Sequence, residues 1–239
     1  MIPAYRFLLI AAAFSAQVCH AAETLITTAH YPNGETVPYV LNYTNPSPRY
    51  VIILFPGGMG TVNPRMEDGK LTYAARGNFL VRSRKFIVDD EFSTVLTNAS
   101  PNEERIQVIL DDLKNRFPTA RIYLMGTSRG TFDTMQLAEY LSDKIAGEIH
   151  TSSLDRIASF NAKKYKNRHL VVHHKRDRCF TTPFNRAQYS HEQYGNDFIA
   201  MEGGTETGDP CHGPSHHSYN GIEKETIDAI KQWIKQGDG

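Results

Sequence analysis

The stretch from Ile122 to Leu141 constrains the fold of this chain more than any other. An apolar run over 122–125 predicts a strand, and the apolar residues spaced along 129–141 predict a helix with a broad apolar side. Between them lies Gly126-Thr127-Ser128-Arg129-Gly130, which fits the pattern G-x-S-x-G. A tight turn of this kind strains the backbone and leaves little room for side chains, hence a glycine on each side of the serine. The stretch predicts a serine hydroxyl that projects from the end of a sheet toward the positive end of a helix.

Length and charge narrow the class of protein. A chain of 239 residues suits one large domain with a sizeable core. Lysine plus arginine and aspartate plus glutamate number 26 each, so the formal net charge is zero. This balance gives no basis for a nucleic-acid partner, and we expect a small-molecule one.

Residues 1–21 have the pattern of a secretory signal peptide. Arg6 supplies the positive start, and the apolar stretch over 7–16 is too short for a good membrane span. Small residues follow, and we predict cleavage after Ala21, with Ala22 as the alternative. The mature domain would then cover residues 22–239 and be secreted or periplasmic. No later segment is long and apolar enough to predict a membrane span.

The cysteines agree with export. Of three cysteines, Cys19 would leave with the signal peptide, and Cys179 and Cys211 would remain as an even pair in an oxidising compartment. We therefore predict a disulfide between Cys179 and Cys211. A lipoprotein anchor at Cys19 is a weaker alternative, because Gln17-Val18 lacks the usual Leu-x-small run before it.

Strand and helix patterns alternate along the mature chain. Predicted strands cover residues 24–31, 36–42, 50–55, 92–96, 122–125, 147–150, 169–173 and 197–201. The first two are joined at Pro32-Asn33-Gly34, a hairpin-turn signal. Helices are predicted over 79–88, after Ser100, after Ser128 and near the C-terminus, whereas residues 61–78 carry no pattern that assigns an element. The alternation predicts a single α/β domain: a mainly parallel sheet with an N-terminal hairpin, helices on both faces, and little or no lid.

The second helix has a predicted start and a predicted buried face. Ser100 is expected to cap it, with Pro101 at its first position and Glu103 closing a capping box. Apolar residues at helical spacing, from Ile106 to Phe117, then indicate that one side packs on the sheet.

Four polar clusters are expected at the carboxyl ends of the strands, where ligands bind in such sheets. They are the glycine loop after the strand over 50–55, Ser128, Asp177, and the loop that carries His212, His216 and His217. A serine hydroxyl is a weak nucleophile at neutral pH and needs a base, and the base needs a carboxylate to orient it. Serine, aspartate and histidine follow one another in that order along this chain.

On these marks the sequence resembles the α/β-hydrolase family over nearly the whole mature chain. The resemblance implies that Ser128 attacks a carbonyl carbon and that Asp177 orients the base. His217 is the preferred base, because His217-Ser218-Tyr219-Asn220-Gly221 resembles a run found there in the family. The oxyanion would be held by the backbone N–H of Arg129 and by one from Gly58 or Met59. The choice between Gly58 and Met59 stays open, because Pro56 stands before the glycines where many relatives carry histidine, and this leaves the position of the donor uncertain by one residue.

Other residues compete for these roles. His216 and His212 are alternative bases, and Asp155 is a weaker candidate for the acid. His173 and His174 are interpreted as structural residues at a strand end. His150 and His169 are interpreted as surface groups or as core groups with satisfied hydrogen bonds.

The leading hypothesis is an exported serine hydrolase that cleaves an ester, thioester or amide of a small to medium soluble substrate without a cofactor or metal. One alternative is a periplasmic metal-binding protein that uses Cys211, His212, His216 and His217, although their spacing matches no common metal motif. Another is a non-catalytic binding protein with a hydrolase fold.

Overall fold

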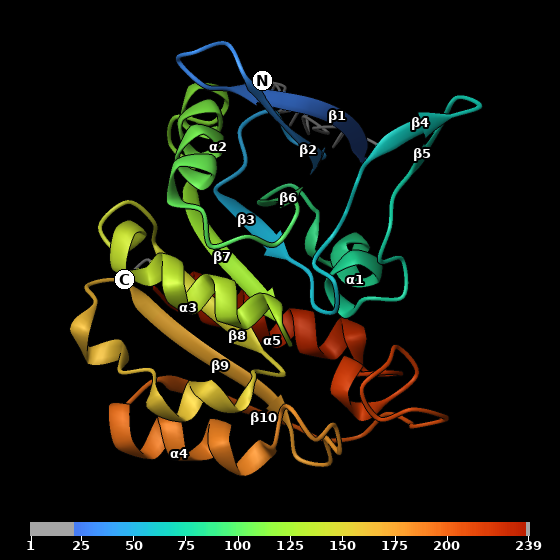
Figure 1. Ribbon diagram of the computed structural model, residues 1–239, viewed down its shortest axis with the longest axis vertical. Coiled ribbons are helices and arrows are strands. Elements are labelled where there is room, and N and C mark those ends of the chain that lie inside the picture. Colours follow the sequence, from blue (N-terminus) through green and yellow to red (C-terminus); the bar gives the residue numbers. More distant parts are fainter. Residues whose placement is uncertain (1–21, 238–239) are drawn as a thin grey trace, which may run out of the picture.

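The computed structural model describes residues 22–237, and the predicted signal peptide, residues 1–21, lies outside this range. An eight-stranded sheet forms its centre, in the order β1-β2-β6-β3-β7-β8-β9-β10 (Figure 1). Its strands are β1 (Glu23–His30), β2 (Thr36–Tyr43), β3 (Tyr50–Phe55), β6 (Phe92–Leu96), β7 (Arg121–Thr127), β8 (Gly147–Thr151), β9 (Arg168–His174) and β10 (Asp197–Met201). The β1–β2 and β2–β6 pairs are antiparallel, and all other neighbours are parallel. The predicted mainly parallel sheet with an N-terminal hairpin is confirmed.

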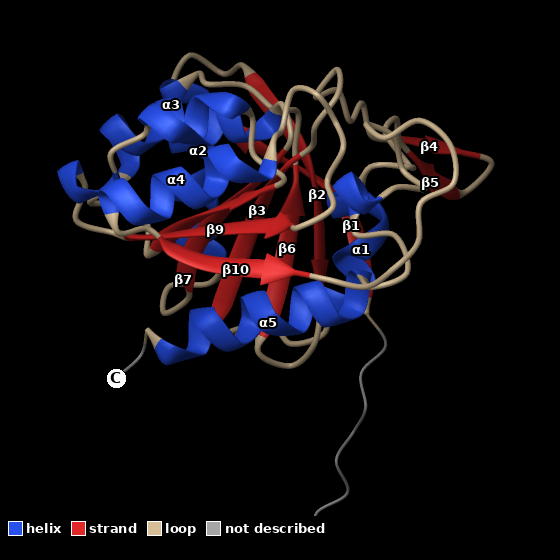
Figure 2. Ribbon diagram, turned by 90° about the horizontal axis from the view of Figure 1, so that it is seen from below, coloured by secondary structure: helices blue, strands red, loops and turns tan. Residues whose placement is uncertain are grey.

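Helices cover both faces of the sheet, as predicted (Figure 2). They are α1 (Phe79–Ile87), α2 (Glu103–Arg116), α3 (Gly130–Leu141), α4 (Phe184–Tyr194) and α5 (Glu223–Gln236). One apolar core lies between the sheet and α1 with α5, and another lies between the sheet and α2 with α3. All six residues of β3 are buried, which explains why that strand is a continuous apolar run.

The start of α2 differs from the prediction. The capping side chain is Asn102, whose Oδ1 accepts a hydrogen bond from the backbone N–H of Arg105 at 2.8 Å. Ser100 lies two residues upstream and accepts from the N–H of Asn102 instead. Asparagine caps a helix as well as serine does, and here it is the residue that directly precedes the first turn.

Two further features carry no sequence signal that predicts them. A short hairpin, β4 (Arg65–Glu67) with β5 (Lys70–Thr72), fills the unassigned stretch and projects away from the sheet (Figure 1). Helix α4 buries only Ala187 and Ser190, so it shows almost no apolar periodicity. None of the helices within residues 22–237 combines the length and the apolar character that a bilayer-spanning segment needs.

Candidate active site

Ser128 lies in a sharp turn between β7 and α3. Its φ is +51°, a left-handed conformation that is uncommon for serine. The flanking glycines are required by close packing. A Cβ on Gly126 would lie 2.6 Å from the carbonyl oxygen of Gly130, and one on Gly130 would lie 2.1 Å from that of Phe55. The predicted shape of the stretch, a buried strand followed by a strained turn and a helix, is therefore present.

Asp177 and His217 meet although they lie 40 positions apart. Asp177 follows the end of β9, and His217 belongs to the short 3-10 turn η3 (His216–Ser218). The imidazole Nδ1 of His217 lies 3.0 Å from Oδ2 of Asp177. With its Nδ1–H donated to the carboxylate, His217 keeps the lone pair on Nε2. His217 and Ser128 line the same cavity, whose volume is about 570 Å³.

The side chain of Asp177 is buried and receives more hydrogen bonds than the sequence predicts. Its Oδ2 lies 3.0 Å from Oγ1 of Thr182 and 3.2 Å from Nε2 of His173, and its Oδ1 accepts from the N–H of Cys179 at 2.9 Å. Burial by itself would raise the pKa of Asp177. The hydrogen bonds from His173 and His217 outweigh burial and hold that pKa below its usual value. The carboxylate is therefore ionised at neutral pH.

The other candidates for base and acid lie elsewhere. The ring of His216 stacks on His174 with centroids 4.5 Å apart, and its Nδ1 lies 3.4 Å from Oε2 of Glu206. His212 lines the cavity, but its side chain is 75 % exposed and its nearest carboxylate is that of Asp209, at 3.6 Å. Asp155 is exposed in the 3-10 turn η1 (Asp155–Ser159). Among His212, His216 and His217, the three candidate bases, only His217 is paired with Asp177.

The C-terminal histidines do not converge on a common point. Cys211 is bonded to Cys179, His217 is bonded to Asp177, and His216 faces Glu206. Within residues 22–237, the side chains that lie close enough together to bind one metal ion are instead an interior group of Glu148, His150 and His169.

A glycine loop after β3 forms the opposite wall of the cavity. A Cβ on Gly57 would lie 2.9 Å from Cβ of Ser128, so this loop packs directly against the serine. In the described part of the chain, the N–H groups of Gly58, Met59 and Arg129 have no backbone acceptor. These are the three backbone donors that the sequence analysis selects.

Asn78 is a cavity residue that the sequence analysis missed. Its Oδ1 caps α1 by accepting from the N–H of Leu80 at 3.0 Å. The amide Nδ2 then points the other way, and a Cβ on Gly57 would lie 3.4 Å from it. Asn78 and Ser128 line the same cavity. The position of Asn78, directly before the first apolar residue of a helix, is the only sequence signal that singles it out.

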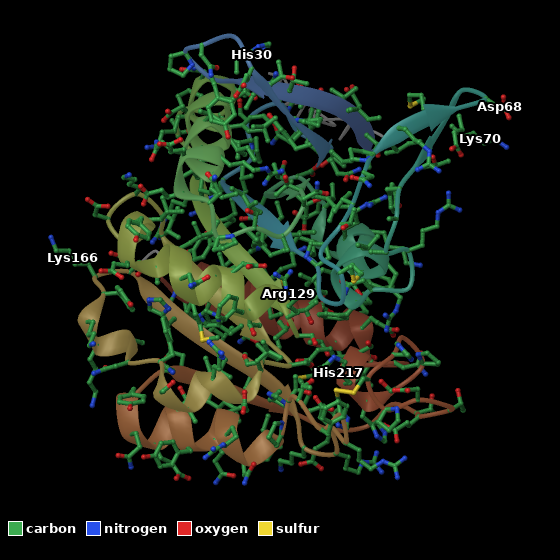
Figure 3. The ribbon with its side chains drawn as sticks, in the orientation of Figure 1. His30, Asp68, Lys70, Arg129, Lys166 and His217 are labelled. Atoms are coloured by element: carbon green, nitrogen blue, oxygen red, sulfur yellow. A yellow bond between two sulfur atoms is a disulfide. The ribbon has the colours of Figure 1, made fainter. Side chains whose placement is uncertain are left out.

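Three tethers hold the loop that carries His217. The predicted disulfide between Cys179 and Cys211 is present and joins this loop to the Asp177 loop (Figure 3). Oγ of Ser152 donates to the carbonyl oxygen of His217 at 2.6 Å. On the outer side, the guanidinium of Arg82 donates to the carbonyl oxygen of Ser218 at 2.6 Å.

Arg82 and Tyr219 anchor these tethers in the body of the protein. Arg82 also forms a half-buried ion pair with Glu223 at 2.9 Å. Tyr219 is fully buried, and its hydroxyl donates to the carbonyl oxygen of Val172 at 2.8 Å and accepts from the N–H of Ser152 at 2.9 Å. The base loop is thus bonded to Arg82 of α1, which is paired with Glu223 of α5, and to the ends of β8 and β9.

No family model and no curated protein matches the sequence. Solved structures do resemble the fold. A Xanthomonas campestris α/β serine hydrolase without lid aligns over 91 % of this chain and 98 % of its own, with a TM-score of 0.62 and 11 % identity. Est1E from Butyrivibrio proteoclasticus aligns over 89 % and 98 %, with a TM-score of 0.59 and 14 % identity.

The Pyrococcus furiosus esterase Pf2001 gives a third likeness. It aligns over 90 % of this chain and 92 % of its own, with a TM-score of 0.61 and 10 % identity. These similarities show that residues 22–237 have the α/β-hydrolase fold with little or no lid, as the sequence resemblance implies.

Proposed function

We propose that this protein with an α/β-hydrolase fold is a serine hydrolase that cleaves an ester, thioester or amide through an acyl-enzyme. One observation carries the proposal. The paired imidazole of His217 and the strained Ser128 share one cavity, and the carboxylate of Asp177 holds that imidazole by its Nδ1 at 3.0 Å. Such a constellation turns a weak hydroxyl nucleophile into an effective one.

In the acylation step, Oγ of Ser128 forms a bond to the carbonyl carbon while Nε2 of His217 takes its proton. The carbonyl π electrons move to the oxygen, which becomes an oxyanion. When the oxyanion collapses, the bond to the leaving group breaks, and the protonated His217 gives its proton to that alcohol, thiol or amine. Asp177 stabilises the imidazolium in both stages because it stays ionised.

Backbone N–H groups of Arg129 and Gly58 are the proposed oxyanion donors. Gly58 is favoured over Met59, because it directly follows Gly57, which packs against Ser128. Asn78 is proposed as a third donor through its Nδ2, because that amide faces the cavity while its Oδ1 is occupied by the helix cap. The N-terminus of α3 adds its positive dipole end.

Deacylation repeats these steps with water. His217 takes a proton from the water as its oxygen attacks the acyl carbon, and the bond to Oγ of Ser128 then breaks as the protonated His217 gives that proton to Oγ. A cavity of about 570 Å³ with an open glycine wall fits a small to medium substrate. One of the similar structures, Pf2001, is named an esterase, which favours an ester over an amide.

The first test is labelling with a fluorophosphonate probe, which reacts with an activated serine. The wild-type protein should be labelled and should hydrolyse p-nitrophenyl esters of short acyl chains. Ser128→Ala should lose both properties while unfolding at an unchanged temperature. Labelling of Ser128→Ala at the wild-type rate would show that another residue is the nucleophile.

Matched pairs of variants test the base and the acid. His217→Ala should lower kcat by at least about 10³-fold, and its neighbour His216→Ala by less than about tenfold. Asp177→Ala and the exposed Asp155→Ala form the same comparison for the acid. Equal effects within either pair would contradict the assigned roles.

Export of the mature chain stays part of the proposal. The disulfide supports an oxidising compartment, since such bonds rarely persist in the cytosol. The intact mass of the protein recovered from the periplasm or the medium should correspond to a chain that begins at Ala22.

A further inference from the structure

A second group of functional side chains lies in the interior, on the two strands β8 and β9. Glu148 and His150 alternate along β8 and so point to the same face of the sheet. His169 is the register partner of Glu148 on β9. All three side chains are buried, with at most 5 % exposed. None of them lines the cavity that Ser128 and His217 share.

These three residues present polar atoms that have no hydrogen bond in the described part of the chain. Both carboxylate oxygens of Glu148, Nε2 of His150 and Nδ1 of His169 are buried without one, and the amide Nδ2 of Asn167 beside Glu148 is buried and unpaired as well. Each such atom costs about 1–3 kcal/mol when it is left unsatisfied. Both histidines are core groups, one of the two expected placements, but one ring nitrogen of each is unsatisfied, which differs from the expectation of satisfied groups. Four unsatisfied atoms lie in one place, and one bound ion could satisfy them together.

Hydrogen bonds on the far side of each ring fix which nitrogen is free. Thr134 donates its hydroxyl proton to the carbonyl oxygen of Thr131 at 3.1 Å, so its Oγ1 accepts from Nδ1–H of His150, also at 3.1 Å. His169 donates Nε2–H to Oδ1 of Asn167 at 3.0 Å. The lone pairs on Nε2 of His150 and Nδ1 of His169 are left free. Metal-binding histidines are oriented by outer hydrogen bonds of this kind.

The free atoms lie close enough to share one ion. One ligand atom from each residue can be chosen so that all lie within 4.8 Å of one another, and Nε2 of His150 lies 3.9 Å from Oε2 of Glu148. In a tetrahedral zinc site with bonds of about 2.0–2.2 Å, ligand atoms lie about 3.4 Å apart. Side-chain movements of less than about 1 Å would close the group around an ion, as these bond lengths require.

We propose that Glu148, His150 and His169 bind one divalent transition-metal ion, for which Zn²⁺ is the best match, and that this ion links β8 to β9 inside the protein. Two imidazoles and one carboxylate are ligands that zinc accepts readily. The site lies near the start of β9, at the end of that strand where Figure 3 places Lys166 and away from His217. The ion therefore has a structural role and takes no part in the proposed hydrolysis.

Access to the site runs through the segment that covers it. Rings of Phe160 and Tyr165 lie 5.3 Å and 5.5 Å from that of His169. They belong to a stretch with only two short 3-10 turns, η1 and η2 (Ala162–Lys164). An ion can enter only when this stretch opens locally, which we expect to be slow. The metal is therefore added both by long incubation with the folded protein and during refolding.

The experiment measures metal binding directly on untagged mature protein. After dialysis against a chelator, the protein is refolded with Zn²⁺, freed of excess metal and analysed by mass spectrometry of the elements. We expect one equivalent of zinc and a raised unfolding temperature. Refolding with Co²⁺ should give the visible absorption of a cobalt ion bound by nitrogen and oxygen. Less than about a tenth of an equivalent after both loading routes would overturn the proposal.

Three variants locate the site. Glu148→Gln and His169→Asn should each weaken zinc affinity by at least about 100-fold, more than the loss of an outer hydrogen bond would. Glu148→Gln should fold at least as well as the metal-free wild type, because it removes a buried acid. His216→Asn, in the C-terminal histidine loop, should keep full binding. Zinc that is lost from His216→Asn but kept by the other two would assign the ion to that loop and refute the interior site.

Discussion

Removing the bond between Cys179 and Cys211 should affect both stability and turnover, for separable reasons. The perturbation is the double variant Cys179→Ala/Cys211→Ala. Cys179 lies two residues after Asp177 and donates its N–H to that carboxylate, whereas Cys211 begins the loop that leads to His217. The bond therefore joins the proposed acid to the loop of the proposed base.

The size of the stability effect follows from the loop that the bond closes. The two cysteines are 32 positions apart, and chain entropy predicts that such a cross-link stabilises the fold by about 4 kcal/mol. For a protein of this length, 1 kcal/mol corresponds to about 2–4 °C in the unfolding temperature. The double variant should therefore unfold about 8–16 °C below the wild type.

Turnover should fall as well, because Asp177 and His217 lose a shared constraint. We expect kcat/KM for a p-nitrophenyl ester to drop at least about tenfold at a temperature where the variant is still folded. Wild type treated with reductant serves as the matched control, because it loses the bond without a change in sequence. An unchanged unfolding temperature would refute the cross-link estimate. A lowered temperature with unchanged kcat/KM would refute the positioning role.

Three further predictions concern single residues. Gly130→Ala places a Cβ 2.1 Å from the carbonyl oxygen of Phe55 and should lower the free energy of unfolding by at least about 3 kcal/mol. The control is Gly77→Ala, whose Cβ would have no atom within 4 Å and which should change this free energy by less than about 0.5 kcal/mol. Urea unfolding measures both variants. Tyr219→Phe removes the hydroxyl that joins the ends of β8 and β9 beside the base loop. It should therefore lower the free energy of unfolding by about 1–3 kcal/mol and slow ester turnover. An unchanged free energy of unfolding would contradict this role of the hydroxyl. Burial acts to raise the pKa of Asp177, but hydrogen bonds from histidines hold this pKa below its ordinary value in the folded protein. The ionised carboxylate therefore stabilises the fold fully at a pH above the ordinary pKa, and this contribution is lost as the pH falls through the lowered pKa of the folded state. The stability advantage of wild type over Asp177→Asn should accordingly be present at pH 5 and shrink below about pH 4, and an advantage that grew on acidification would have the wrong sign.

Local sequence determined the parts of the site that depend on neighbours along the chain. The strand, turn and helix around Ser128 follow from an apolar run, two glycines and a helical spacing, and the packing distances at Gly126 and Gly130 show why no other residue fits. The disulfide followed from parity alone, once Cys19 was assigned to the predicted signal peptide. The cap of α2 and the whole of α4 escaped prediction because Asn102 and Ser100 are equivalent as caps, and because α4 buries too few apolar residues to show a period.

Tertiary structure decided which distant groups meet. Among three histidines within six residues, a resemblance to a family run favours His217 but leaves His216 and His212 as alternatives, and only the fold pairs His217 with Asp177. The contacts of His173 and Thr182 with that aspartate, and the approach of Asn78 to the glycine loop, likewise arise across elements.

The interior group on β8 and β9 shows the same division. Alternation along a strand predicts that Glu148 and His150 share a face, yet it says nothing of the partner strand. Only the register of β9 against β8 sets His169 beside Glu148. Periodicity encodes the direction in which a side chain points, whereas the neighbour it meets depends on pairing and packing between segments that the chain brings together only when it folds.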